Sequence, residues 1–416
     1  MLRHTSAVST EAAAAPVPTV REPGFGRRMR WVTVLYFAQG FPFGIFREVW
    51  AVFFRSRGVS LTEIGMMELL GLPWVAKPLW APLVDRYGDR RKWVAGCLVV
   101  LAICLALHTT FPVTADPGIY VWAVLFAFTM ASATQDIAID AHTIAFLPRG
   151  EEGAANGIRV SAYRAATIVA GGFLLSAAGF LGWGPAWMAG AGILLVLAVV
   201  VLRAPAAELV TTERKLVFAP FRRWLAKPGS IPTLAFVLLY KLGDQAISPM
   251  IRPFWIDSGR TIQEIAWVSN TFGIAATIVG ALIGGFWTMR LGLIRGLVIM
   301  GIFQASSNLG YALVALTGAE KFPLYGASVW ESFTQGLGTA AFLSLLMRLC
   351  DKEHAGVQYA LLSALFSLAR HVSGAASGWA ADRLGFGTFA LYTVLLSIPA
   401  FLLLPWVRRR IEAVDR

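Results

Sequence analysis

Residues 184–202, GPAWMAGAGILLVLAVVVL, decide the fold because nineteen consecutive positions carry no charge. About twenty apolar residues in a helix cross the hydrocarbon core of a bilayer. Similar runs recur along the chain of 416 residues, of which 57% are hydrophobic and 14% are charged. A soluble domain averages roughly a quarter charged residues. The composition therefore predicts a polytopic α-helical membrane protein, and it excludes a soluble enzyme, a disordered chain and a disulfide-stapled secreted domain.

The apolar runs predict twelve transmembrane helices in two groups of six. A tail (1–30) precedes the first half (31–203), a polar linker (204–230) precedes the second half (231–407), and a tail (408–416) ends the chain. In the linker, helical spacing of apolar residues predicts an interfacial helix built on Val217, Phe218, Phe221, Trp224 and Leu225. The predicted spans are 31–54, 62–84, 93–110, 119–147, 157–181, 184–202, 231–250, 264–289, 293–316, 323–347, 356–380 and 388–407.

The distribution of basic residues predicts the orientation. With the N-terminus inside, 24 of the 36 Lys and Arg fall on inside segments and 6 on outside loops. Basic residues collect on cytoplasmic loops, so we expect both termini in the cytoplasm. The net charge of +12 then indicates a lipid bilayer, not a nucleic acid, as the partner. The three cysteines form no cluster of the metal-binding type, so no metal site is predicted.

The two halves resemble each other in sequence. Ser132-Ala133-Thr134-Gln135 recurs as Ser332-Phe333-Thr334-Gln335, and Arg86-Tyr87-Gly88 recurs as Arg290-Leu291-Gly292, at shifts of 200 and 204. Two further matches occur at a shift of 202, each in the corresponding helix. Six spans separate the copies, so the repeats share one orientation. Two parallel six-helix halves with a site between them indicate a transporter that works by alternating access.

A charged segment, PLVDRYGDRR (82–91), connects the second and third spans on the predicted cytoplasmic side. Gly88 allows a tight turn, and Asp85 can pair with an arginine across the bundle, so that the pair holds one conformation and breaks in the other. We interpret Asp85, Arg86, Gly88, Arg90 and Arg91 as a conformational latch. The alternative is simple anchoring of the loop by its basic residues.

Asp136 and Asp140 lie four residues apart on the fourth span and therefore on one helix face. A carboxylate at membrane depth costs free energy, which makes both side chains candidates for carrying a proton. The alternative is a structural ion pair with Arg159 or Arg164 of the fifth span.

The seventh span carries Lys241-Leu242-Gly243-Asp244, in which Lys241 and Asp244 can pair with each other and Gly243 can let the helix bend. The first span has a similar break at 40–44, followed by Arg47-Glu48. First helices of each half face the site in transporters built from repeats. We therefore place Asp244 with the proton carriers and Lys241, Arg47 and Glu48 at the site, with an internal salt bridge as the alternative.

The other polar residues within spans complete the predicted site. Cations near the midplane suit carboxylates of an anionic cargo, to which they donate charge-assisted hydrogen bonds. Amide side chains suit the hydroxyl and amide groups of a sugar or peptide. Arg164 and Arg370 are the cations and Gln135 and Gln335 the amides assigned to the site, and the carboxyl group of Glu331 is assigned to substrate binding with them.

Several stretches together resemble the AmpG-type muropeptide permeases of the major facilitator superfamily. They include Gly71-Leu72-Pro73-Trp74, Lys77-Pro78-Leu79-Trp80-Ala81-Pro82-Leu83, Gln135–Ala141, Leu239–Asp244, Gln304–Asn308 and Gly338–Phe342. The resemblance covers about 31–405. It implies the major facilitator fold and a proton-driven permease of the bacterial inner membrane that imports anhydromuropeptides for cell-wall recycling. No Walker loop, metal cluster or nucleophile triad appears in the sequence, so we expect neither catalysis nor a cofactor, with the proton gradient as the energy source. The resemblance also implies matching charges at Lys77, Asp136, Asp140, Arg164, Lys241, Asp244, Glu331 and Arg370.

Two departures keep other cargoes open. Many muropeptide permeases have two further C-terminal helices beyond the twelve predicted here, and Arg47-Glu48 occupies a stretch that is uncharged in better-known members. Related branches carry siderophores or acyl-coenzyme A, which are also large and anionic. A membrane sensor that never transports is the alternative from another class. We expect the protein to act as a monomer on a small anionic sugar–peptide.

Overall fold

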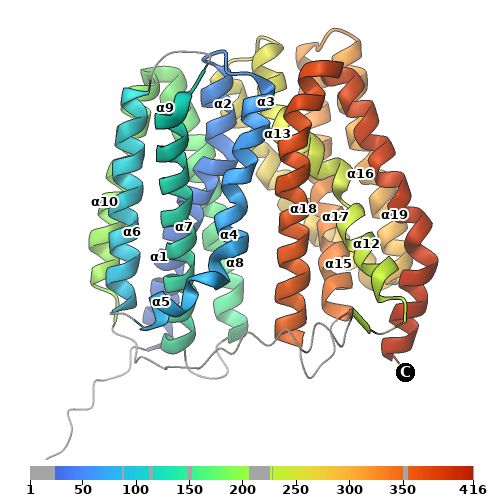
Figure 1. Ribbon diagram of the computed structural model, residues 1–416, viewed down its shortest axis with the longest axis horizontal. Coiled ribbons are helices and arrows are strands. Elements are labelled where there is room, and N and C mark those ends of the chain that lie inside the picture. The colour runs from blue at the N-terminus through green and yellow to red at the C-terminus, as the bar shows by residue number, and fades with distance from the viewer. Residues whose placement is uncertain are drawn as a thin grey trace, which may run out of the picture.

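The computed structural model describes residues 24–86, 89–111, 116–147, 152–205, 225–226, 228–349 and 355–415. Every regular element of these residues is a helix, and helices lie on each range predicted as a span. The N-terminal and C-terminal halves stand side by side (Figure 1). Eight of the described helices are long and apolar enough to cross a membrane. The all-helical membrane fold is confirmed, whereas the count of twelve spans and the side of the termini stay predictions.

The helices of the N-terminal half are interrupted by short turns of other helix types. In chain order they are α1 (Phe25–Gly44), η1 (Ile45–Val49), α2 (Trp50–Arg55), α3 (Leu61–Met66), η2 (Met67–Gly71), α4 (Leu72–Ala76), η3 (Lys77–Leu79), α5 (Ala81–Arg86), α6 (Arg90–Leu107), η4 (His108–Thr110), α7 (Gly118–Phe146), α8 (Glu152–Ile168), η5 (Val169–Phe173), α9 (Leu174–Leu181) and α10 (Trp183–Leu202).

The C-terminal half follows the same order with longer unbroken helices. Its elements are α12 (Ser230–Leu239), α13 (Leu242–Asp257), α14 (Ile262–Glu264), η6 (Ile265–Phe272), α15 (Gly273–Leu291), α16 (Leu293–Leu316), α17 (Lys321–Arg348), α18 (Ala355–Leu384) and α19 (Phe386–Asp415).

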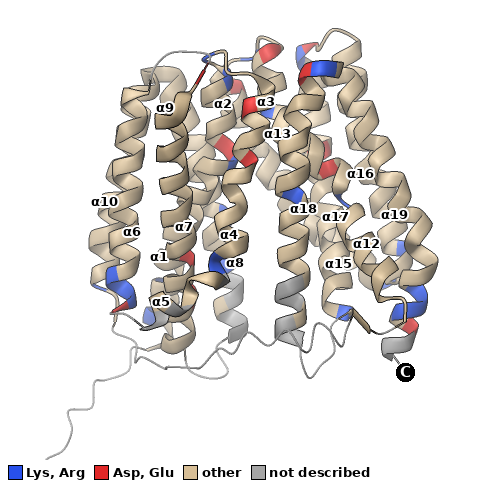
Figure 2. Cartoon of the chain, in the orientation of Figure 1, with Lys and Arg blue, Asp and Glu red and all other residues tan. Residues whose placement is uncertain are grey.

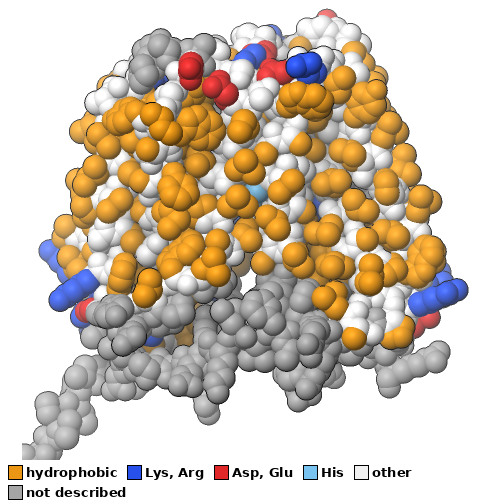
Figure 3. Space-filling model, in the orientation of Figure 1, with side chains coloured by type: hydrophobic (Ala, Val, Ile, Leu, Met, Phe, Trp, Pro, Cys, Tyr) orange, Lys and Arg blue, Asp and Glu red, His pale blue; other side chains and the backbone are white. Residues whose placement is uncertain are grey.

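The outer surface carries a broad apolar band. Figure 3 shows hydrophobic side chains over the middle of the molecule and charged side chains near its two ends. Large apolar residues are exposed there, among them Val196 at 64%, Leu282 at 71% and Leu402 at 68%. An apolar surface of this extent would aggregate in water and is satisfied by lipid chains.

Glycines set the closest helix contacts within the C-terminal half. A side chain at Gly280 of α15 would overlap the carbonyl oxygen of Phe333 in α17. At Gly284 the added atom would lie 2.6 Å from the carbonyl oxygen of Leu337. Small residues four positions apart let two helix backbones approach in a membrane. The spacing of Gly280 and Gly284 predicts this packing, and the structure confirms it.

The breaks in the first and seventh spans differ from the expected form. The seventh span is interrupted at Tyr240 and Lys241, between α12 and α13, before Gly243. Gly243 itself packs against the backbone of Thr393 in α19, where no side chain would fit. In the first span α1 continues through Pro42 and passes into the π-helical turn η1. Position 243 therefore needs a glycine because α13 packs closely against α19 there, and not because the helix bends at this residue.

Other sequence predictions differ at segment ends. The tail predicted from residue 408 is helical to Asp415, because Val407 and Ile411 continue a buried apolar face of α19. Four members of the predicted interfacial helix, Val217, Phe218, Phe221 and Trp224, lie outside the described residues. The fifth, Leu225, packs against the core of the C-terminal half.

The two halves meet mainly at one end, which we call the closed end and which contains residues 55–62 and 257–262. There α3 contacts α18, α2 contacts α13, and η5 contacts η6 (Figure 1, top). Gly65 of α3 approaches Gly378 of α18 so closely that an added side-chain atom would lie 2.8 Å from the Gly378 nitrogen. If the termini are cytoplasmic, as predicted, the closed end faces the periplasm.

Candidate functional site

A cavity of about 620 Å³ lies between the halves. This volume falls in the range of small-molecule sites, roughly 300–1,000 Å³. Charged residues occur near the middle of several helices as well as at their ends (Figure 2). Six cations and four acids line the cavity, and they are Arg47, Lys77, Arg159, Arg164, Lys241, Arg370, Glu48, Asp136, Asp140 and Asp244.

On the N-terminal wall, both aspartates of α7 face the cavity and each has a cation nearby. Lys77 Nζ lies 3.8 Å from Asp136 Oδ2. Asp140 Oδ1 accepts a hydrogen bond of 2.9 Å from the Tyr36 hydroxyl and lies 3.5 Å from Arg159 Nη2. The structure thus brings the expected aspartates into the cavity and also supplies the ion pair named as the alternative, with Arg159 as the partner of Asp140.

On the C-terminal wall, Lys241 and Asp244 form a buried pair at the break between α12 and α13. Their side chains are 5% and 7% exposed, and Nζ lies 3.6 Å from Oδ2. Lys241 also donates a hydrogen bond of 2.7 Å to Thr339 Oγ1 of α17. The second carboxylate oxygen of Asp244, Oδ1, has no partner among the described residues. Asp244 can therefore accept a proton or a cargo donor without first losing Lys241.

Two predicted binding residues lie away from the cavity lining. Gln135 is fully buried and donates a hydrogen bond of 3.0 Å to the Ala38 carbonyl of α1, so it joins two helices of one half. Glu331 is buried beside Gln335, whose Nε2 donates to Glu331 Oε1 at 3.4 Å. Gln335 itself, with Arg164 and Arg370, lines the cavity as predicted.

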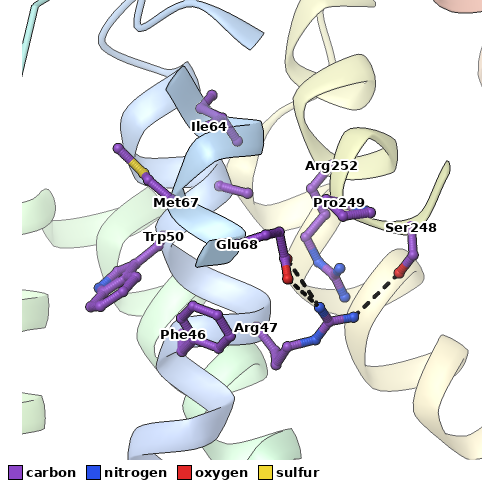
Figure 4. Close-up of a pocket in the computed structure, with 10 residues that line it drawn as sticks. Phe46, Arg47, Trp50, Ile64, Met67, Glu68, Ser248, Pro249 and Arg252 are labelled. Carbon is purple, nitrogen blue, oxygen red and sulfur yellow. Dashed lines mark hydrogen bonds and ion pairs between the residues drawn. The ribbon is translucent and has the colours of Figure 1, made fainter. Parts of the chain in front are cut away.

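Arg47 lies at the closed end of the cavity and is held from both halves (Figure 4). Its Nη1 donates to Glu68 at 3.0 Å, and its Nη2 donates to Ser248 of α13 at 3.4 Å. The other oxygen of Glu68 lies 3.3 Å from Nδ1 of His371 in α18. Arg47 therefore faces the cavity, as predicted, but it also bridges the halves.

Glu48 and Arg252 pair directly across the interface between the halves. They lie 204 residues apart in the sequence, one in each half. With its amide oriented so that both neighbours are satisfied, Asn270 of η6 donates to Glu48 at 3.3 Å and accepts from the Gly172 nitrogen at 2.6 Å. The predicted binding residue Glu48 is thus the centre of a contact that holds the closed end together.

A second ion pair closes the same end nearer the surface. Arg55 of α2 donates to both oxygens of Asp257, at 2.6 and 2.8 Å. Bidentate pairing of this kind fixes geometry as well as charge. Asp382 of α18 also accepts from the backbone nitrogen of Thr62 at 2.7 Å.

Of the predicted latch, the structure describes the side chains of Arg90 and Arg91. Arg91 pairs with Asp89 at 2.5 Å and donates to the Ala204 carbonyl at 2.7 Å. Its hydrogen bonds hold the pKa of the Asp89 carboxyl below the ordinary value. Arg90 donates to the Ala141 carbonyl at 3.3 Å. These contacts stay within the N-terminal half, while Gly88 and the side chains of Asp85 and Arg86 lie outside what the structure describes.

Sequence reasoning missed the pairing residues of the closed end: Glu68, Arg252, Arg55 and Asp257. Sequence reasoning also missed Gln245 and Ser248 of the cavity lining. Their spacing from Asp244 was the available signal, because residues 244, 245 and 248 share one face of α13, which begins just after Lys241.

Comparison with known proteins agrees with this geometry. The model of the Major Facilitator Superfamily matches residues 32–240. The anhydromuropeptide permease of Escherichia coli K12 is 35% identical over 393 residues, covering 91% of this chain and 79% of that protein. A putative transporter, AmpG 4, of Rickettsia conorii is 27% identical and covers 92% of this chain and 97% of that protein.

Solved structures show the same fold at low sequence identity. A bacterial homologue of the human lysosomal transporter Spinster, in an inward-facing and unoccupied conformation, superposes with a TM-score of 0.75 and 14% identity. The match covers 94% of this chain and 99% of that one. From the shared fold and the sequence match over nine-tenths of its length, the chain belongs to the major facilitator superfamily and, within it, to the family of the anhydromuropeptide permease.

Proposed function

We propose that this protein imports anhydromuropeptides across the bacterial inner membrane by proton-coupled alternating access. The observation that carries the proposal is the cavity between the halves, lined by six cations and four acids. Among the described residues Arg370 donates only to Ser367, at 3.3 Å, and its Nε has no partner. A half-buried guanidinium with a free donor suits a carboxylate of the cargo.

The ion pairs of the closed end give the transport cycle its moving contact. To admit cargo from that side, the Glu48–Arg252 and Arg55–Asp257 pairs must separate, since each joins the two halves. Arg47 is placed to respond to cargo, because it faces the cavity and also bonds Ser248 across the interface. A cargo carboxylate that takes Arg47 from these partners would favour one conformation over the other.

Asp244 is the proposed proton carrier with the clearest test. Asp244→Asn is expected to abolish uphill uptake and to leave counterflow exchange within about threefold of wild type, because the amide keeps the shape of the side chain and an oxygen facing Lys241 but cannot take up a proton. Both rates are measured in proteoliposomes. Glu412→Gln, at the exposed Arg408–Glu412 pair of α19, is the control and should change neither rate. Uphill uptake by Asp244→Asn would exclude this residue and leave Asp136 and Asp140 as candidates.

The cargo is tested by competition. Unlabelled anhydromuropeptide should suppress uptake of labelled anhydromuropeptide, while a ferric siderophore and an acyl-coenzyme A should not. If the siderophore or the acyl-coenzyme A suppresses uptake, the competitor that does so is assigned as a cargo of the site. Binding of muropeptide without any movement into vesicles would favour a sensor that does not transport.

A further inference from the structure

Two glutamines at the cavity have polar atoms without partners. Gln39 of α1 and Gln245 of α13 are each 5% exposed, and both line the cavity. Among the described residues, Oε1 of Gln39 and both Oε1 and Nε2 of Gln245 accept or donate no hydrogen bond. A buried amide without partners costs free energy, and most buried polar atoms in proteins have one. Unmet polar atoms on residues that line a cavity point to a ligand that meets them.

The surroundings of Gln245 place this unmet amide beside the charged part of the site. Residues 244, 245 and 248 share one face of α13, and Lys241 lies directly before its first turn. Gln245 therefore lies between the Lys241–Asp244 pair and Ser248, which accepts a hydrogen bond from Arg47. A cargo group bound by Gln245 therefore lies about one helical turn from Lys241 on one side and from Ser248, with its partner Arg47, on the other. An amide that neighbours a carboxylate in the cargo fits this position.

Gln39 faces the cavity from the opposite half with a different neighbourhood. Phe43 lies one turn further along α1, and its ring packs edge-on against Trp74 with centroids 5.4 Å apart. Nε1 of Trp74 is also without a partner among the described residues. This wall therefore offers one acceptor, one donor and two aromatic rings, which suits an uncharged polar group with an apolar face.

We propose that Gln245, with Gln39 across the cavity, forms a subsite for secondary amides of the cargo. This inference rests on the proposed function. It adds that the cavity binds amide groups of the cargo as well as the carboxylates of the cargo. Gln245 offers one donor and one acceptor, the two groups that bind the oxygen and the N–H of an amide. Such amides occur in the acetamido groups of the sugars and in the attached peptide, and the test separates the two.

The test uses Gln245→Met, which keeps the length of the side chain and removes its donor and acceptor. Uptake is measured in proteoliposomes for three cargoes: the intact muropeptide, one whose acetamido groups are replaced by hydroxyls, and one without the peptide. For the intact cargo, KM should rise about tenfold with kcat within about twofold of wild type, as lost cargo hydrogen bonds predict. Wild-type protein should have a lower KM for the intact cargo than for the cargo that lacks the recognised amide. In the Gln245→Met variant these two KM values should be about equal.

Gln304→Met is the matched control. Gln304 is also a buried glutamine of the C-terminal half with an unmet Nε2, but it does not line the cavity. Its KM values should stay within about twofold of wild type. Gln245→Asn, which keeps the amide on a shorter side chain, should show a smaller rise in KM than Gln245→Met. It serves as the second variant if methionine prevents folding.

The outcomes separate this inference from the proposed function. A wild-type protein that transports muropeptide, with a Gln245→Met variant that keeps the wild-type preference among the three cargoes, overturns the subsite alone. A wild-type protein that neither binds nor transports muropeptide overturns the proposed function and the subsite with it. Loss of preference for the acetamido cargo assigns the sugar amide, and loss of preference for the peptide-bearing cargo assigns the peptide amide.

Discussion

Glu48→Arg is expected to lower transport by more than about 100-fold. The substitution places two guanidinium groups opposite each other at the closed end, where Glu48 and Arg252 now pair with largely buried side chains. Removing one partner of a buried pair costs about 3–5 kcal/mol, and each 1.4 kcal/mol is a factor of ten. The closed end should then fail to form, and initial uptake rates in proteoliposomes measure the loss.

The double substitution Glu48→Arg with Arg252→Glu restores the pair with its polarity reversed. It should recover at least about a tenth of wild-type transport, since the two side chains pair directly. Recovery stays partial because Asn270 donates to Glu48 in the native arrangement. Glu412→Arg, at the exposed pair within α19, is the control and should transport normally. A double variant as inactive as Glu48→Arg would show that the pair does not act as a gate.

Gly378→Val is expected to hold the closed end open without unfolding the protein. An added side-chain atom at Gly378 of α18 would overlap the Leu61 carbonyl of α3 and lie 3.0 Å from Gly65 Cα. These neighbours belong to the opposite half, so the clash exists only when the closed end forms. Overpacking costs about 1–3 kcal/mol, and the higher value lowers the population of that conformation more than 100-fold.

Labelling of a cysteine measures this shift. Ala51 lines the small pocket at the closed end, so Ala51→Cys reports its opening to a membrane-impermeant maleimide in oriented vesicles. In the Gly378→Val background the cysteine should label at least about tenfold faster, and transport should fall in parallel. Gly310→Val is the matched control, because nothing lies within 4 Å of an added atom there. Unchanged labelling in folded Gly378→Val protein would contradict the role given to this contact.

Much of the fold could be predicted from the sequence because a bilayer imposes a simple rule on length and polarity. Each apolar run of sufficient length became a helix, and Gly280 with Gly284 marked a close helix contact. The π-helical turns η1, η5 and η6 were not predicted, because the apolar pattern around them is continuous. They lie where the halves approach each other, which is a property of the tertiary contact.

The site was predicted where charge inside a span was itself the signal, as for Asp136, Asp140 and Asp244. Orientation around a helix was harder to predict. Gln135 lies on α7, a helix whose most apolar stretch is 61% buried, so its sequence does not show which side faces the cavity. The unmet amide of Gln245 became visible only when the partners of every neighbouring atom were known.

The central measurement is uptake of labelled GlcNAc–anhydroMurNAc-tripeptide into proteoliposomes, with and without an imposed inward proton gradient. We predict accumulation above the external concentration only when the gradient is present, because the cavity combines cations for the cargo carboxylates with acids that can carry a proton. Equal uptake with and without the gradient would contradict proton coupling. No uptake by oriented, folded protein would contradict the proposed cargo.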